Sequence, residues 1–140
     1  MAGALGGADA MITADQLVAH AVGDYVLQSD YMALDKTSSS IPAAAHALSY
    51  TLPFLLLTTS PLALGFIATT HFLIDRWRLA RYVVWLKNFL APRRFWYSWS
   101  ECRGTGYHRD RPPWMAVWLL IAADNTLHVL CNGIAIAYFR

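Results

Sequence analysis

The chain has 140 residues, which is enough for one domain. Hydrophobic residues make up 56% of it and charged residues only 14%, against about 25% charged residues in an ordinary soluble domain. Too few charges remain to cover a water-facing surface, so the composition favours a membrane protein. The net charge of +2 is too small for a nucleic-acid-binding protein, and we exclude that class.

The N-terminal segment lacks both the basic start and the apolar centre of a cleavable signal peptide. Residues 1–10 are mostly glycine and alanine, and we expect them to form a flexible tail ahead of a single helical membrane domain, residues 11–140. Within that domain, Thr13 to Gln16 form a capping-box pattern. This pattern predicts a helix that runs to about Gln28.

A polar connector, Ser29–Ser40, separates the first helix from a second one that begins near Pro42. Pro53 is expected to kink this second helix. The helix then ends in the Thr-Thr-Ser-Pro run at 58–61. Its length suits one crossing of a bilayer.

A third helix is predicted from about Leu62 to Asp75, with an amphipathic, basic extension that stops at Pro92. The segment Arg93–Pro113 is basic and aromatic and is expected to form a loop. A fourth long apolar helix follows, Trp114–Phe139. The predicted fold is therefore all-α: a four-helix integral membrane bundle with a basic aromatic loop between helices three and four.

The distribution of positive charge predicts how this bundle is oriented. Of the 11 lysine and arginine residues, all except Arg140 fall in the connector, at the end of helix three or in the loop that follows. With four crossings these positions lie on one side, which the positive-inside rule makes the cytoplasm. We therefore expect a multi-pass protein of a bacterial inner membrane, with the lipid bilayer as its partner. An oligomer is compatible with this arrangement.

Ionisable residues interrupt the apolar helices in a repeated pattern. Three pairs have i,i+4 spacing, which puts both members on one helix face, and a single histidine stands in helix two. These residues are His20 with Asp24, His71 with Asp75, Asp124 with His128, and His46. Because helix four runs opposite to helices one and three and reads Asp before His, all three pairs point the same way. The histidines would form one layer and the aspartates another, about 6 Å away.

Imidazole and carboxylate side chains on facing helices are typical of metal sites in helical bundles. Zinc is the expected ion, and iron or manganese is compatible with the same ligands. The candidate metal ligands are His20, His46, His71, Asp75, Asp124 and His128. Asp24 and Asp75 are the candidate catalytic residues, with Asp24 as general base or as a partner that orients a ligand.

Three further polar residues lie near these groups in the sequence and are candidates for binding substrate or water. They are Gln28, Asp30 and Asn125. The alternative for each is a structural role, either in capping a helix end or in a hydrogen bond between helices.

Three segments carry a resemblance to a known family: His20–Lys36, His71–Arg78 and Asp124–His128. Together they resemble an uncharacterised family of small integral membrane proteins found in bacteria and bacteriophages. The resemblance implies a multi-helix membrane protein whose histidine and aspartate positions form a shared signature, and it implies no activity. A looser similarity, in the arrangement of His and Asp across membrane helices, is to predicted membrane-bound metal-dependent hydrolases.

The function predicted from these observations is that of a metal-dependent hydrolase at the cytoplasmic membrane face. Its substrate would be amphipathic or phosphorylated and drawn in by the arginine-rich loop, which could also hold an anionic lipid. Four alternatives stay open: a polar network that only fixes helix register, a proton or ion relay, a non-enzymatic phage factor that modulates the host envelope or excludes other phages, and a soluble helical metal protein.

Overall fold

The computed structural model describes residues 10–139, and every regular element in that range is helical. The elements are α1 (Ala14–Ala21), a π-helical turn (Val22–Val26), α2 (Asp30–Asp35), α3 (Ser40–Thr51), a 3-10 turn (Leu52–Leu56), α4 (Pro61–Trp77), α5 (Ala80–Lys87), two 3-10 turns (Asn88–Leu90 and Arg93–Phe95), α6 (Trp99–Cys102) and α7 (Pro113–Tyr138). The all-α prediction is confirmed. The predicted N-terminal tail lies, apart from Ala10, outside the described residues.

Several predicted boundaries agree with local hydrogen bonds. The Thr13 hydroxyl caps α1 by accepting from the Gln16 backbone N–H at 3.4 Å. Pro53 lies in the 3-10 turn that replaces regular α-helix after Thr51, as expected for a residue that cannot donate a backbone hydrogen bond. The polar connector contains a helix that we did not predict, α2, which Ser29 caps.

Helix three does not run on into its basic extension. Arg78 ends α4 in the left-handed conformation, with φ 51° and ψ 50°. Its N–H bonds to the Asp75 carbonyl, and the Leu79 N–H bonds to the Ile74 carbonyl at 2.9 Å, which is the Schellman pattern of a helix end. Glycine usually occupies such a position. Because arginine stands there instead, the sequence contains no glycine signal for this break.

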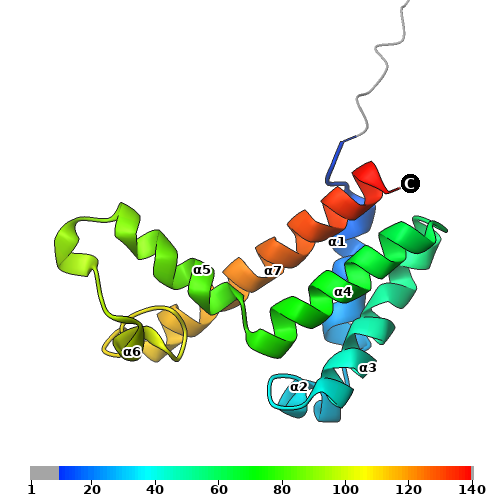
Figure 1. Cartoon of the computed structure of the whole chain (residues 1–140). Helices are drawn as coiled ribbons and strands as arrows, with labels where there is room; N and C mark the ends of the chain where they lie inside the picture. The colour runs from blue at the N-terminus through cyan, green and yellow to red at the C-terminus, as the bar shows by residue number, and fades with distance from the viewer. Residues whose placement is uncertain (1–9, 140) are drawn as a thin grey trace, which may run out of the picture.

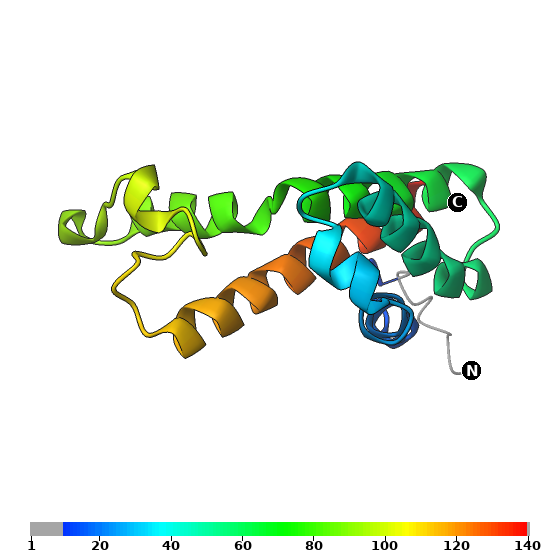
Figure 2. The same ribbon diagram turned by 90° about the horizontal axis from the view of Figure 1, so that it is seen from below.

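The helices form two regions, which we call the bundle and the arm (Figure 1). The bundle consists of α1, α3, α4 and the C-terminal half of α7; α4 packs against both α3 and α7, and α1 packs against α7. The arm, residues 78–112, contains α5 and α6. It projects from the bundle beside the N-terminal half of α7 (Figure 2).

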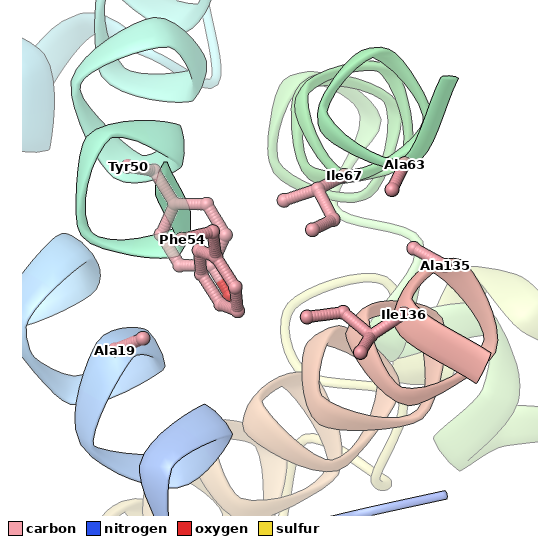
Figure 3. Packing of buried hydrophobic residues seen from close by; sticks show 7 residues of the cluster. All are labelled: Ala19, Tyr50, Phe54, Ala63, Ile67, Ala135 and Ile136. Carbon is pink, nitrogen blue, oxygen red and sulfur yellow. The ribbon is translucent and has the colours of Figure 1, made fainter. Parts of the chain in front are cut away.

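The apolar core occupies one end of the bundle. It contains Ala19, Tyr50, Phe54, Ala63, Ile67, Ala135 and Ile136. The rings of Tyr50, in α3, and Phe54, in the 3-10 turn after it, point toward side chains of α4 and α7 (Figure 3). This core is small because the centre of the bundle is filled by polar side chains, including His46, His71 and His128, each at most 1% exposed.

Large apolar side chains instead cover the outside. Those exposed by at least 60% are Val18, Tyr25, Val26, Leu34, Ile41, Leu48, Leu56, Leu62, Leu90, Trp114, Trp118 and Tyr138. Extensive exposed apolar surface marks a membrane or protein contact. The bundle is thus polar within and apolar outside, the reverse of a soluble domain.

Four membrane crossings are not supported. Among the helices of residues 10–139, α7 alone is long and apolar enough to cross a membrane, and 28% of its apolar stretch is buried. A crossing needs about 20 helical residues, whereas α1, α3 and α4 have 8, 12 and 17 residues. These helices are short because the π-helical turn, the turn at Pro53 and the left-handed Arg78 interrupt the predicted spans.

Candidate metal centre

Four buried side chains from three segments, the π-helical turn, α3 and α4, meet in the middle of the bundle, and we call them the inner group: Asp24, His46, His71 and Asp75. Each offers one ligand atom, and these atoms all lie within 4.8 Å of one another. His46 Nε2 lies 3.1 Å from Asp24 Oδ1 and 3.3 Å from Asp75 Oδ2. His71 Nε2 lies 3.1 Å from Asp75 Oδ2 and 3.8 Å from Asp24 Oδ1.

A second set of ligand atoms shares Asp75 with the first. This outer group consists of Asp75, Asp124 and His128. His128 Nε2 lies 3.3 Å from Asp75 Oδ1 and 3.4 Å from Asp124 Oδ2. The two oxygens of Asp75 therefore face different groups, the arrangement of a carboxylate that bridges a pair of metal ions.

Carboxylates outnumber fixed cations in this centre. Within ion-pair distance lie three carboxylates, Asp24, Asp75 and Asp124, and a single fixed cation, Lys36, whose Nζ is 2.8 Å from Asp75 Oδ2. With neutral imidazoles, three negative charges and one positive charge leave −2, whereas two protonated imidazoles would bring the sum to zero. Buried charges are costly unless they are neutralised. A divalent cation would balance the centre.

Unpaired atoms in the inner group also fit a metal ion. Both ring nitrogens of His71 are buried and have no hydrogen-bond partner, and the same holds for Nδ1 of His46. Asp75 Oδ2 also lacks a hydrogen bond of acceptable direction, although Lys36 is close enough for an ion pair. Orphaned buried polar atoms are rare and cost about 1–3 kcal/mol each. Coordination would satisfy His71 Nε2 and Asp75 Oδ2 together.

The spacing of the inner group can be compared with a tetrahedral zinc site. Zinc bonds to nitrogen and oxygen are about 2.0–2.1 Å long, so neighbouring ligand atoms of a tetrahedron lie about 3.3 Å apart. The separations between the imidazole nitrogens and carboxylate oxygens of the inner group are 3.1–3.8 Å. The inner group therefore has ligand types and spacing that suit a divalent transition metal.

Local backbone geometry brings Asp24 into the inner group. Asp24 lies in the π-helical turn that follows α1, and such turns are frequent at functional sites. Gly23 beside it lets the backbone approach α3 closely. A Cβ atom at Gly23 would lie 2.7 Å from Tyr50 Cδ2 and 2.8 Å from the Tyr50 carbonyl oxygen. Because glycine has no side chain, the π-helical turn can pack closely on α3, and this packing brings Asp24 to the inner group.

His20, which we predicted to be a metal ligand, lies outside both groups. Its Nδ1 is 2.9 Å from the Tyr50 hydroxyl and its Nε2 is 2.9 Å from Asn125 Oδ1. Asn132 donates to the Tyr50 hydroxyl at 2.6 Å, so this hydroxyl donates its own proton to His20 Nδ1. His20 Nε2 then carries the proton that Asn125 accepts. Both nitrogens of His20 are therefore used in hydrogen bonds.

A cavity of about 260 Å³ opens onto the centre. It is lined by Asp24, Tyr25, Gln28, Lys36, Thr37, Asp75, Arg78, Ala80, Leu120, Ile121, Asp124 and Asn125. Of the three predicted substrate-binding residues, Gln28 and Asn125 face this cavity, and the Gln28 Oε1 atom has no partner. Asp30 is exposed in the first turn of α2 and does not line it.

Sequence reasoning missed three residues of this site. Lys36 reaches Asp75 from the connector, Arg78 lines the cavity from the end of α4, and the Tyr50 ring stacks on His71 at 3.6 Å between centroids. Tyr50 could have been suspected, because it lies i+4 from His46 on the same helix face. No pattern in the sequence indicates Lys36 or Arg78, since both depend on how the chain turns.

A comparison with family models decides where the chain belongs. The model described as Protein of unknown function (DUF3307) matches residues 12–98, more than half of the chain. The chain belongs to this family. The DUF3307 match contains the whole inner group and ends before Asp124 and His128. No curated protein and no solved structure matches the chain.

Proposed function

We propose that this protein is a membrane-embedded, divalent-metal-dependent hydrolase whose ion is held by the inner group. The observation that carries the proposal is the buried meeting of Asp24, His46, His71 and Asp75, with ligand atoms within 4.8 Å. The charge of the centre, its unpaired atoms and its spacing all favour a divalent ion. Zinc suits this donor set best, with iron or manganese as alternatives.

Two observations support a location in the membrane. The helix α7 is long and apolar enough to span a bilayer and is mostly unburied. The outward-facing leucine, isoleucine and valine side chains of the bundle are the surface that lipid tails would contact. The cationic arm would then lie on the cytoplasmic side, following the positive-inside rule.

The cavity supports a hydrolytic rather than a purely structural centre. A divalent ion in the inner group would supply Lewis-acid chemistry and activate water for hydrolysis. Asp24 lines the cavity, and its Oδ2 atom has only a long contact with His20, at 4.0 Å. This oxygen is free to accept a proton from water, which makes Asp24 the general base. Asp75 links the two groups and acts as a metal ligand.

One observation favours a second candidate, a metal-free polar network that fixes helix register. Lys36 already forms an ion pair with Asp75, and each imidazole except His20 has a carboxylate oxygen within 3.4 Å. Such a network could hold the helices together without an ion. It would leave both ring nitrogens of His71 without a hydrogen bond, although Nε2 lies 3.1 Å from Asp75 Oδ2, which is why we prefer the metal centre.

Elemental analysis of the purified full-length protein tests the proposal. We expect about one or two equivalents of a transition metal in the wild type, and hydrolysis of phosphate-ester or acyl-ester probes that chelation abolishes. His71→Ala should lose the metal and the activity. His20→Ala is the matched control, because it removes a buried imidazole whose ring nitrogens bond to Tyr50 and Asn125. It should keep the metal.

The outcomes separate the two candidates. Metal-free wild-type protein that takes up no zinc, manganese or iron on titration would favour the structural network. If the His71→Ala variant still binds metal, the ion is held at a site other than the inner group. A bound metal without hydrolysis of any probe would limit the protein to metal binding.

A further inference from the structure

Two cations from different segments lie at the cavity above the acidic centre. Lys36 comes from the connector after α2, and Arg78 comes from the end of α4. The carboxylates of Asp24, Asp75 and Asp124 line the same cavity. A cavity lined by cations and by the ligands of a metal centre is suited to an anion that contacts both.

Lys36 has a partner that metal binding would remove. Its Nζ lies 2.8 Å from Asp75 Oδ2, the oxygen that also faces His46 and His71. A divalent ion held by that oxygen would repel the ammonium group and use the negative charge that now holds it. Lysine cannot itself coordinate while protonated. Loading the inner group would therefore release Lys36 toward the cavity.

Arg78 is fixed at its place by the backbone. It is a non-glycine residue with φ 51°, a conformation that side chains with a Cβ adopt at a cost. Its Nη2 donates to the Gly104 carbonyl at 3.0 Å, which ties the cavity to the arm. Arg78 lines the cavity, and the N–H donors of its guanidinium group that Gly104 does not use can bind an anion.

We propose that Lys36 and Arg78 form a subsite for a phosphate group, and that this subsite becomes available when the metal centre is loaded. The inference rests on the proposed function and adds the substrate class, a phosphate ester. Leu120 and Ile121 of α7 form an apolar wall of the cavity, which would accommodate an apolar group next to the phosphate. Arginine and lysine are the side chains that recognise phosphate in proteins.

The first test measures metal affinity of the full-length protein in phosphatidylcholine nanodiscs by competition with a zinc chelator. Lys36→Met should bind zinc about tenfold more tightly than the wild type, because the competing ammonium is gone. Arg78→Gln should bind zinc within about twofold of the wild type. Lys87→Met is the matched control, since Lys87 lies in the arm against Tyr107; it should change nothing. If Lys36→Met does not fold, Lys36→Arg is measured instead, a variant that keeps the positive charge.

The second test titrates inorganic phosphate into the zinc-loaded protein by calorimetry. Wild type and Lys87→Met should bind phosphate, and both Lys36→Met and Arg78→Gln should bind it at least about tenfold more weakly. Lys36 thus has opposite effects on the two affinities. Nanodiscs that contain phosphatidic acid show whether the phosphate group belongs to a lipid or to a soluble molecule. If phosphatidic acid competes with inorganic phosphate for the subsite, the substrate is a lipid phosphate. If it does not compete, the substrate is a soluble phosphate ester.

The results that overturn the inference differ from those that overturn the proposed function. If zinc binds but phosphate does not, or if phosphate binds equally to wild type, Lys36→Met and Arg78→Gln, the subsite is refuted and the metal centre stands. If Lys36→Met leaves zinc affinity unchanged, the release of Lys36 is refuted. If no metal binds at all, the metal centre and the subsite that depends on it are both refuted.

Discussion

The bundle and the arm both contain many charged or ionisable side chains, but in opposite surroundings. In the bundle, Asp75 is 5% exposed and faces three imidazoles and one ammonium group. In the arm, the cations lie over aromatic rings, as the half-buried Arg81 does over Tyr82 and Trp99. Burial makes the charges of the bundle depend on one another, whereas those of the arm act singly.

Glu101, an acidic residue of the arm, differs from the buried carboxylates of the bundle in the same way. Hydrogen bonds from Ser98 hold the pKa of the Glu101 carboxyl below its usual range, and the two residues form a capping box for α6. Glu101 is therefore satisfied by its own helix and by water. Asp24 and Asp75 of the bundle are buried and surrounded by imidazoles, so changes there should have much larger effects.

The largest effect is expected from Asp75→Asn. This change removes the carboxylate shared by the inner and outer groups and leaves Lys36 without a buried counter-charge. Breaking a buried ion pair on one side costs about 3–5 kcal/mol, and we expect the bound metal to be lost as well. Thermal unfolding and elemental analysis measure both.

Asp110→Asn is the matched change in the arm. The Asp110 side chain is 79% exposed and lies 3.5 Å from His108. Unfolding should shift by no more than about 0.5 kcal/mol, and the metal content should stay the same. Equal effects of the two substitutions would refute the contrast between the regions.

The contrast also explains how much could be predicted from the sequence. The i,i+4 spacing correctly put His71 beside Asp75 and Asp124 beside His128, which lie 3.1 and 3.4 Å apart, because helical periodicity alone determines which face a residue occupies. The all-helical fold followed from apolar periodicity and from the cap at Thr13. These features are local, and they are the part of the fold that was confirmed.

The features that the sequence did not reveal depend on long-range packing. The helices are shorter than the predicted spans because they break at Val22–Val26, which contains Gly23 but no proline, and at Arg78, where neither proline nor glycine stands. The place of His20 depends on Tyr50 and Asn125, which are 30 and 105 residues away. The same spacing that puts His20 beside Asp24 could not show that both ring nitrogens have other partners.

An intermediate effect is expected from Gly23→Ala, which tests how backbone packing supports the buried centre. The new methyl group would lie 2.8 Å from the Tyr50 carbonyl oxygen, so the π-helical turn and α3 must separate. Overpacking of this kind costs about 1–3 kcal/mol. Because Tyr50 stacks on His71 and Asp24 follows Gly23, zinc affinity should fall too, which the chelator competition measures.

Gly65→Ala is the control for this substitution. Gly65 lies inside α4, and a Cβ atom there would meet nothing within 4 Å. Alanine in a helix interior is favoured over glycine by about 1 kcal/mol, so this variant should be slightly more stable and keep its metal. Destabilisation by Gly65→Ala instead would show that an outward face of α4 is already covered.

A small effect is expected from Arg81→Gln in the arm. Its guanidinium carbon lies 5.1 Å from the Tyr82 ring centroid and 5.4 Å from that of Trp99, and Nη1 donates to the Arg103 carbonyl at 3.2 Å. Cation–π contacts near the surface contribute about 0.5–1 kcal/mol, so the unfolding free energy should fall by about that amount. Metal content and zinc affinity should not change, because no charge of the bundle depends on Arg81. A loss of zinc in this variant would mean that the arm holds the centre in place through Arg78, and the two regions would then form one cooperative unit.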